Sequence, residues 1–156
     1  MELVVFIGLQ GSGKSSFYRA RFAETHVHVS KDRMHNDRNR ARRQRELVDA
    51  ALRAGRSVVV DNTNPRPADR EELIHLGREL GAGVVGYYFE CDIQDCLARN
   101  RKREGRERVP DVALFVTRSK LTPPSYGEGF DRLYRVRATG DSQFDVSEWQ
   151  EAEPRA

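Results

Sequence analysis

The sequence predicts an α/β fold, in which a doubly wound parallel sheet of five strands carries helices on both faces. Short apolar runs alternate along the chain with longer stretches of helix-forming residues, and this alternation is typical of a parallel sheet. The first run, residues 3–7, is almost unbroken, as expected of a strand buried on both faces. With 156 residues and no internal repeat, the chain has the length of one domain with a substantial core.

The loop after this first strand, residues 8–15, reads GLQGSGKS and fits the phosphate-binding pattern G-x-x-x-x-G-K-[ST]. Its glycines let backbone N–H groups approach a triphosphate closely at the start of a helix, which residues 16–22 can form. The pattern predicts that Lys14 reaches the β- and γ-phosphates of ATP, that Ser15 is a ligand of Mg²⁺, and that the fold is that of a P-loop NTPase. The residues expected to bind ATP are Gly11, Ser12, Gly13, Lys14, Ser15 and Ser16.

Charge is abundant but nearly balanced, with 33% charged residues and a net charge of +3. Most of the positive charges are arginines, whose planar side chains favour bidentate contact with phosphate. Because a near-balanced total can still include a basic face, the distribution of the arginines matters more than their sum.

The two cysteines, Cys91 and Cys96, lack C-x-x-C spacing and are too few for a disulfide framework. We expect them to be buried or free thiols in a reducing compartment. No apolar run reaches the length of a membrane span, and the N-terminus lacks the basic start of a signal peptide. The sequence therefore predicts a cytoplasmic protein.

Two acidic residues follow predicted strands. Asp32 comes just after the strand at 25–30, and ligands of open α/β sheets bind at the carboxyl ends of strands, so Asp32 is a candidate general base. The strand at 57–61 ends in Asp61, an arrangement in which the carboxylate supports Mg²⁺. His26 and His28 share one face of their strand. We expect them at the surface or in packing, because no carboxylate or cysteine lies at ligand spacing.

Residues 36–54 form a predicted helix that ends at Gly55. Its second half supplies apolar residues to the core, and its first half is rich in arginine. Arg38, Arg42 and Arg45 share one face of this helix by i, i+4, i+7 spacing. Two interpretations remain open, a solvated helical face or a surface that binds a polyanionic substrate.

The second half of the chain continues the alternation. We expect strands at 84–89 and 133–137, and helices at 67–80, 92–103 and 111–121.

The segment 101–108 is too charged to belong to a core. It forms either a solvated turn or a mobile lid, spanning about 99–109, whose arginines close over the triphosphate. Arg99 and Arg103 lie one helical turn apart on a common face, so both would belong to such a lid.

A resemblance to a known family rests on four features that occur in order along the chain: Lys14, Asp32, the D-N-T-N-P loop at 61–65, and the pair Arg99 and Arg103. With these features, the chain resembles the kinase domain of the polynucleotide 5′-hydroxyl kinases of phage and animal repair, within the P-loop kinase superfamily. The resemblance covers about residues 1–137. The animal repair kinases carry the D-N-T-N-P loop in this form, whereas the phage enzyme has an aspartate where Asn62 stands.

The resemblance implies a role for each of these residues. Asp32 would be the general base that takes the proton from a 5′-hydroxyl group. Lys14 and Ser15 would hold ATP and Mg²⁺. Arg103, together with Arg99, would clamp the transferring phosphoryl group.

The acceptor contacts are where the sequence departs from the phage enzyme. That enzyme has an arginine three residues after its base, which contacts the 3′ phosphate of the acceptor, whereas this chain has His35 there. Arg38 or the following arginines would have to replace that contact. The residues expected to bind the acceptor are His35, Arg38, Asn62, Asn64 and Arg70.

The expected domain organisation is a P-loop kinase domain over residues 1–138 and a C-terminal tail over 139–156. Phe144, Val146 and Trp149 are apolar enough to dock that tail. The D-x-D-G-T motif of the phosphatase domain often fused to such kinases does not occur in the sequence.

Three functions are compatible with these patterns. The first is an ATP-dependent kinase that phosphorylates the 5′-hydroxyl end of DNA or RNA, with no membrane partner. The second is a kinase of the same superfamily that acts on a nucleoside, a sugar or a sugar nucleotide. The third is a nucleotide-gated binding module without an acceptor. Asp32 argues against the third, because a switch needs a residue that positions water and has no need of a base facing an acceptor.

Overall fold

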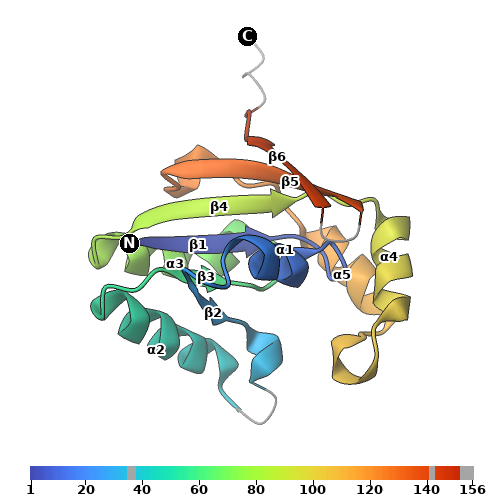
Figure 1. Ribbon diagram of the computed structural model, residues 1–156, viewed down its shortest axis with the longest axis horizontal. Coiled ribbons are helices and arrows are strands. Elements are labelled where there is room, and N and C mark those ends of the chain that lie inside the picture. The colour runs from blue at the N-terminus through green and yellow to red at the C-terminus, as the bar shows by residue number, and fades with distance from the viewer. Residues whose placement is uncertain (35–37, 141–142, 152–156) are drawn as a thin grey trace.

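A central sheet organises the computed structural model, which describes residues 1–34, 38–140 and 143–151 (Figure 1). Within this part of the chain the sheet has six strands in the order β2-β3-β1-β4-β5-β6. The strands are β1 (Glu2–Ile7), β2 (Val27–Val29), β3 (Val58–Val60), β4 (Gly83–Phe89), β5 (Arg132–Gly140) and β6 (Gln143–Glu148). The first five run parallel, so the predicted doubly wound α/β fold is confirmed.

The sixth strand corrects the predicted number of five. β6 comes from the segment expected to be a tail, and it pairs antiparallel with β5 at the edge of the sheet. The Phe144 ring packs edge-on against Phe17 at 5.1 Å between centroids. Trp149 donates its backbone N–H to Leu133 O at 2.9 Å, and its ring contacts Tyr88. The sequence identified these apolar anchors but not the strand that holds them.

β1 lies in the middle of the sheet because its side chains are apolar on both faces. Leu3, Val5 and Ile7 are fully buried in one apolar cluster, whereas Val4 and Phe6 are fully buried in another on the opposite face. A strand of this kind is stable only with neighbours on both edges and layers on both faces.

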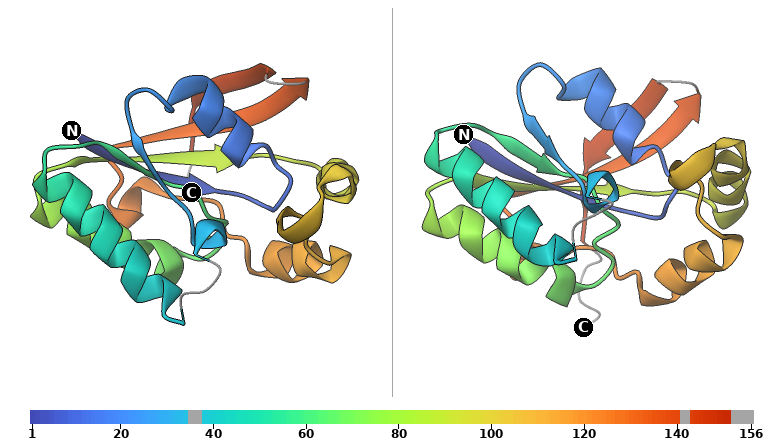
Figure 2. Two further views of the ribbon diagram at one scale, coloured as in Figure 1. Left: turned by 60° about the horizontal axis from the view of Figure 1, so that its bottom comes forward. Right: turned by 90° about the horizontal axis from the view of Figure 1, so that it is seen from below.

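Helices form the two outer layers (Figure 2). They are α1 (Lys14–Arg21), α2 (Arg40–Arg53), α3 (Pro67–Glu79), α4 (Ile93–Lys102) and α5 (Asp111–Lys120). α2 and α3 cover one face of the sheet and α1 covers the other, while α4 and α5 lie beyond the carboxyl ends of the strands (Figure 2). Within the described residues, no helix combines the length and the apolar character needed to cross a membrane.

The arginine-rich helix begins later than the sequence suggests. Asn39 is its N-cap, and its side chain accepts a hydrogen bond from the N–H of Arg42 at 3.1 Å. Arg38 therefore precedes the helix, which corrects its predicted place on one helical face with Arg42 and Arg45. His35 lies outside the described residues.

A short 3-10 helix, η1 (Lys31–Arg33), follows β2 and was not predicted. The Ser30 side chain caps it by accepting the N–H of Asp32 at 3.3 Å. This turn places Asp32 at the carboxyl edge of the sheet, on the same side as the glycine-rich loop after β1.

Candidate active site

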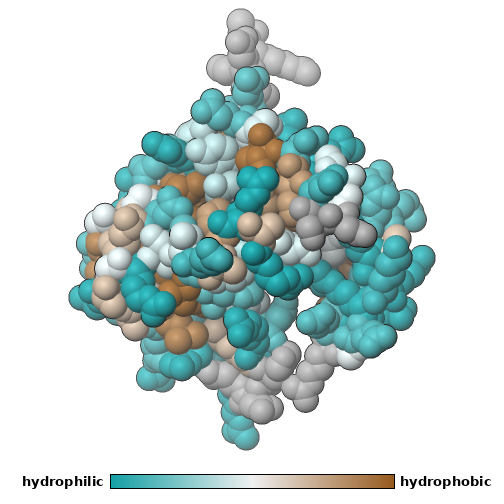
Figure 3. Space-filling view, viewed as in Figure 1, coloured by the Kyte–Doolittle hydropathy of each residue, from teal (hydrophilic) through white to brown (hydrophobic). Residues whose placement is uncertain are grey.

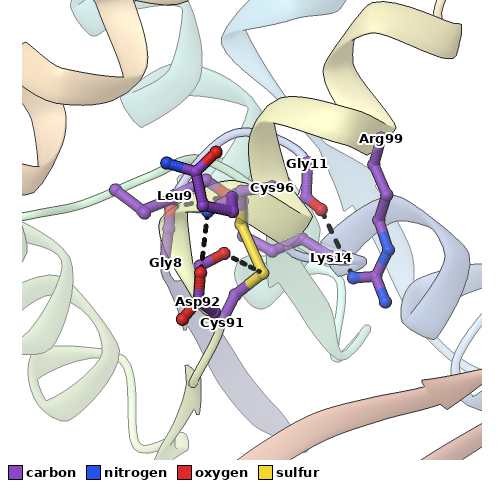
Figure 4. Close-up of a disulfide and its surroundings, with 9 residues drawn as sticks. Gly8, Leu9, Gly11, Lys14, Cys91, Asp92, Cys96 and Arg99 are labelled. Carbon is purple, nitrogen blue, oxygen red and sulfur yellow. Dashed lines mark hydrogen bonds between the residues drawn. A yellow bond between two sulfur atoms is a disulfide. The ribbon is translucent and has the colours of Figure 1, made fainter.

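The glycine-rich loop is held close to the N-terminal turns of α4. Gly11 has φ +80° and Gly13 has φ +100°, both in the left-handed region that favours glycine. A Cβ at Gly11 would lie 2.5 Å from the carbonyl oxygen of Cys96, so only glycine fits there. Arg99, from the next turn of α4, donates from Nη1 to Gly11 O at 3.4 Å. The loop therefore packs closely against α4, through Cys96 and Arg99 (Figure 4).

A disulfide between Cys91 and Cys96 joins the turn after β4 to α4, next to this loop (Figure 4). The expectation of two thiols is therefore wrong. The turn between Phe89 and Ile93 brings the two Cα atoms to 6.4 Å, within the range that a disulfide spans. Sequence spacing gives no signal for this pair, because the turn and not a C-x-x-C pattern brings the two residues together.

Lys14 is the cation at the centre of the loop. Its Nζ donates to Gly8 O at 3.0 Å and to Leu9 O at 2.6 Å, and the residue is only 8% exposed. Burial lowers the pKa of Lys14 to about 8, and the nearby Arg103 acts in the same direction, while Asp61 and Asp32 oppose the shift. Burial of the charged ammonium group is therefore energetically unfavourable in the free protein, and a bound phosphate would offset this unfavourable energy.

We expect ATP affinity to fall as the pH rises through about 8. Below that pH Lys14 carries the charge that attracts phosphate, and above it the free protein increasingly holds a neutral amine. The measurement is the ATP dissociation constant by calorimetry over a pH range that brackets 8. The Lys14→Arg variant keeps its charge over this range, so any decline that persists in it would contradict the assignment to Lys14.

Ser15 and Asp61 meet as expected of a metal site. Ser15 Oγ donates to Asp61 Oδ2 at 2.8 Å, and His28 Nε2 lies 2.8 Å from the same oxygen. Burial raises the pKa of Asp61, but the hydrogen bonds from His28 and Ser15 and the charge of Lys14 outweigh it, so the net shift is downward. A buried carboxylate held ionised beside a hydroxyl is a hard oxygen donor set, which suits Mg²⁺ together with phosphate oxygens.

A cleft of about 410 Å³ opens in front of these groups, and Asp32 lies at its rim. Figure 3 shows the molecule hollowed between η1 and the segment that follows α4. Six basic and four acidic side chains line the cleft. They are Lys14, Lys31, Arg40, Arg66, Arg103 and Lys120, with Asp32, Asp61, Asp69 and Glu107. The cleft therefore brings together the lysine of the glycine-rich loop, the exposed carboxylate of Asp32 and an excess of positive charge.

The D-N-T-N-P loop forms one wall of the cleft, but its two asparagine amides are used within the protein. Asn62 Oδ1 accepts the N–H of Lys31 at 2.9 Å, and its Nδ2 donates to Gln44 Oε1 at 2.5 Å. Asn64 has φ +42° and donates from Nδ2 to Phe6 O at 2.8 Å. These bonds tie the loop to η1, α2 and β1. Both residues line the cleft, and their predicted acceptor contacts stay a prediction.

Arg70 does not face the cleft, which corrects its predicted contact with an acceptor. The residue is fully buried, and Nη1 donates to both carboxylate oxygens of Glu128 at 3.1 and 3.0 Å. Nε donates to Asn64 O at 2.9 Å, and Nη2 donates to the carbonyl oxygens of Pro65 and Thr122. Arg70 therefore holds the D-N-T-N-P loop from behind.

Replacing Arg70 by methionine is expected to lower the free energy of unfolding by about 3 kcal/mol, because it leaves the half-buried Glu128 carboxylate without its ion-pair partner and three carbonyl groups without this donor. Chemical denaturation would measure this loss. The double variant with Glu128→Gln removes the orphaned charge and should recover part of the stability. A single variant as stable as the unmodified protein would contradict this role.

The other predicted arginines divide into two groups. Arg103 follows the last turn of α4 and reaches the cleft, where its charge acts on Lys14. Arg42 and Arg45, by contrast, are exposed and bound to Glu46 at 3.1 Å and Glu72 at 2.6 Å, so their charge is partly compensated. Arg38 is exposed and is not among the residues that line the cleft.

The predicted lid is anchored at its base by Asn100. This fully buried residue donates from Nδ2 to Val109 O at 2.7 Å and accepts the N–H of Val109 at 3.1 Å. The segment between these two residues includes the short helix η2 (Gly105–Glu107). The hydrogen bonds between Asn100 and Val109 hold the two ends of this segment together. Lid closure stays a prediction, with Asn100 as its fixed base.

Several residues of the cleft were missed by sequence reasoning. Arg40, Arg66, Lys31 and Lys120 come from four separate segments, and a basic residue alone gives no signal of where it points. Gln10 donates to Thr117 Oγ1 at 3.0 Å, which joins the glycine-rich loop to α5. His28 was expected at the surface or in packing, yet its Nε2 contacts Asp61 Oδ2.

Comparison with known proteins gives a match over most of the chain. Residues 3–124 match a family model described as an AAA domain. The chain is 30% identical over 158 residues to a putative bifunctional polynucleotide phosphatase/kinase of Acanthamoeba polyphaga mimivirus, an alignment that covers 96% of this chain and 36% of that protein. The chain spans about one third of the length of the curated relatives it matches.

Solved structures share the fold. A fungal RNA kinase superposes with a TM-score of 0.68 at 15% identity, covering 90% of this chain and 41% of that one. A sugar kinase from Janibacter sp. HTCC2649 gives 0.64 at 22% identity, covering 86% of this chain and 85% of that one. The family model and the mimivirus relative confirm the predicted resemblance to P-loop kinases. The solved structures that share the fold include an RNA kinase and a sugar kinase.

Proposed function

We propose that this chain, which belongs to the AAA domain family, transfers the γ-phosphate of ATP to the 5′-hydroxyl end of a DNA or RNA strand. The chain has the fold and the phosphate loop of a P-loop kinase, a phosphotransferase family. The cleft is the observation that supports the 5′-hydroxyl end of a polynucleotide as the acceptor. It joins Lys14 to the exposed carboxylate of Asp32 and has more basic than acidic side chains around both.

The proposed reaction needs positioning and charge more than covalent help from the protein. The Asp32 carboxylate accepts the proton of the acceptor hydroxyl as its oxygen forms a bond to the γ-phosphorus. The bond between that phosphorus and the β,γ-bridging oxygen breaks, and ADP leaves. Lys14 and Arg103 stabilise the negative charge on the transferring group.

Ser15 Oγ and the Asp61 carboxylate would hold Mg²⁺ in this reaction. When bound, this cation neutralises charge on the β- and γ-phosphate oxygens. Within the protein, the task of these two residues is to stay in place, and the hydrogen bond of 2.8 Å between them keeps them together.

A polynucleotide acceptor is supported by the excess of cations along the cleft wall. Lys31, Arg40 and Arg66 lie on the side of η1, α2 and the D-N-T-N-P loop, beyond the residues that serve ATP. A strand end carries phosphates next to its terminal hydroxyl group, and such cations would neutralise them. The mimivirus relative, named a polynucleotide phosphatase/kinase, agrees with this acceptor class.

The test is transfer of label from ATP radiolabelled at the γ-phosphate, with Mg²⁺, to four acceptors in parallel. These are a 5′-hydroxyl DNA oligonucleotide, a 5′-hydroxyl RNA oligonucleotide, the same strands already phosphorylated at the 5′ end, and a pool of nucleosides and sugars. We expect label on a 5′-hydroxyl strand and none on its phosphorylated control. Label in the small-molecule pool alone would overturn the acceptor and favour the fold neighbours that act on sugars. ATP binding without any transfer would favour a nucleotide-gated module.

A further inference from the structure

His28 lies in the strand just before the turn that carries Asp32. It belongs to β2 and lines a second cleft of about 640 Å³, which shares Ser15, Asp32 and Arg103 with the first. The His28 side chain is 16% exposed, and its partner Asp61 is 3% exposed. The reaction proposed above does not use this imidazole directly.

The contacts of His28 fix which nitrogen carries its hydrogen. Arg33 Nη1 lies 3.2 Å from Nδ1, and a guanidinium group can only donate, so Nδ1 is the acceptor. Nε2 then carries the hydrogen and donates it to Asp61 Oδ2 at 2.8 Å. Arg33 therefore selects the tautomer that bonds to the carboxylate.

The plane of the imidazole ring is fixed as well. Tyr18 of α1 stacks on it with 4.0 Å between ring centroids and 14° between planes. The Tyr18 hydroxyl is itself held, because it donates to His26 O at 2.6 Å. A ring held by stacking on one face and by bonds at both nitrogens cannot turn without breaking several contacts.

The bonds of His28 leave one oxygen of Asp61 available. Ser15 and His28 both donate to Oδ2, and within the described part of the chain no side chain donates to Oδ1. Two hydrogen bonds to Oδ2 fix the orientation of the carboxylate and leave Oδ1 available to bind a cation.

We propose that His28 is a positioning residue, which fixes the Asp61 carboxylate for Mg²⁺ and couples it through Arg33 to the turn that carries Asp32. Arg33 directly follows Asp32 in η1, so one chain of contacts joins the metal ligand to the base. The inference rests on the proposed function, because it assumes a reaction that needs both groups in register. This role goes beyond the place at the surface or in packing that the sequence predicts for His28.

The test compares two substitutions of His28 that separate its stacking from its hydrogen bond. His28→Phe keeps a ring against Tyr18 but removes the donor, and His28→Gln keeps a donor near the position of Nε2 but removes the ring. His26→Phe is the matched control, since His26 lies two residues away, just before β2, and pairs with Glu2 at 2.8 Å. The readout is calorimetric ATP binding as a function of Mg²⁺ concentration, without acceptor, beside the melting temperature.

We expect His28→Phe to raise the Mg²⁺ concentration for half-maximal ATP binding by about tenfold or more, the usual effect of losing a residue that orients a metal ligand. His28→Gln should restore most of the affinity, and His26→Phe should leave it unchanged. A purely structural His28 would lower the melting temperature with the Mg²⁺ dependence intact, and this result would overturn the proposal.

Arg33→Met tests the coupling with His28 in place, and it keeps the inference falsifiable if His28→Phe does not fold. Without Arg33 the other tautomer becomes available, so the Mg²⁺ requirement should rise by less than in His28→Phe. An unchanged requirement would overturn the link to η1. Failure of the proposed function is seen separately, as a lack of label on any 5′-hydroxyl strand with the unmodified protein.

Discussion

Replacing Asp32 by asparagine is expected to reduce phosphoryl transfer by about 10²–10⁴-fold, the usual contribution of a positioned general base. Asparagine has nearly the same shape, but it cannot take up the proton that the acceptor hydroxyl releases. The carboxylate is exposed at the rim of the cleft and held there by η1, which its backbone N–H helps to cap. We therefore expect the fold to be unaffected and the loss to fall on kcat.

ATP binding separates this role from a simple electrostatic one. Asp32 adds a negative charge to the cleft that would receive the phosphates, so the variant, which lacks this charge, should bind ATP as well as the unmodified protein or slightly better. Asp49→Asn is the matched control, because that carboxylate lies in a surface ion pair with Arg53 at 2.9 Å. Full turnover in Asp32→Asn would remove the base from the mechanism. A loss of ATP binding would show that Asp32 acts on the donor.

The parts of the site that the sequence predicts are those whose residues lie close together along the chain. The loop at 8–15 can be read from eight consecutive residues, because each glycine meets a local requirement for positive φ or for close approach to a neighbour. Asp61 follows from its place after an apolar strand. The parallel strands follow in the same way from apolar runs that alternate with helix formers.

The parts that the sequence does not predict depend on contacts between distant segments. Asp61 lies 33 residues beyond His28, and only the order β2-β3-β1 brings the ends of their strands together. Arg70 is an arginine on a polar helix, so its burial against Glu128, 58 residues away, leaves no mark in the local pattern. β6 was missed because its burial alternates weakly and its stability comes from pairing with β5.

Replacing Lys14 by methionine is expected to abolish ATP turnover without lowering the stability of the free protein. One cation aimed at a transferring phosphoryl group is worth about 10³–10⁵ in rate, as the arginine finger of related phosphoryl-transfer enzymes illustrates, and methionine supplies none of this. Methionine does keep about the length and the apolar stem of the lysine side chain at this buried position. The activity measurement is label transfer at saturating acceptor.

The stability of this variant follows from the pKa of Lys14, which is lowered from 10.5 to about 8. The folded protein holds fewer protons than the unfolded chain between these two values, so charging Lys14 opposes folding below about pH 8. The cost is fully present at neutral pH, where it amounts to about 3 kcal/mol, and it fades as the pH rises toward 10.5. Lys14→Met should therefore melt at an equal or higher temperature than the unmodified protein at pH 7, with the advantage shrinking in alkali.

Lys31→Met is the control for this effect, because Lys31 lines the same cleft but is only half-buried. Its substitution should leave the pH dependence of the melting temperature unchanged. A lower melting temperature for Lys14→Met at neutral pH would mean that the bonds from Nζ to Gly8 O and Leu9 O stabilise the free loop more than burial of the charge destabilises it. The expected result instead identifies Lys14 as a residue kept at the expense of stability, whose charge is compensated only when phosphate enters the loop.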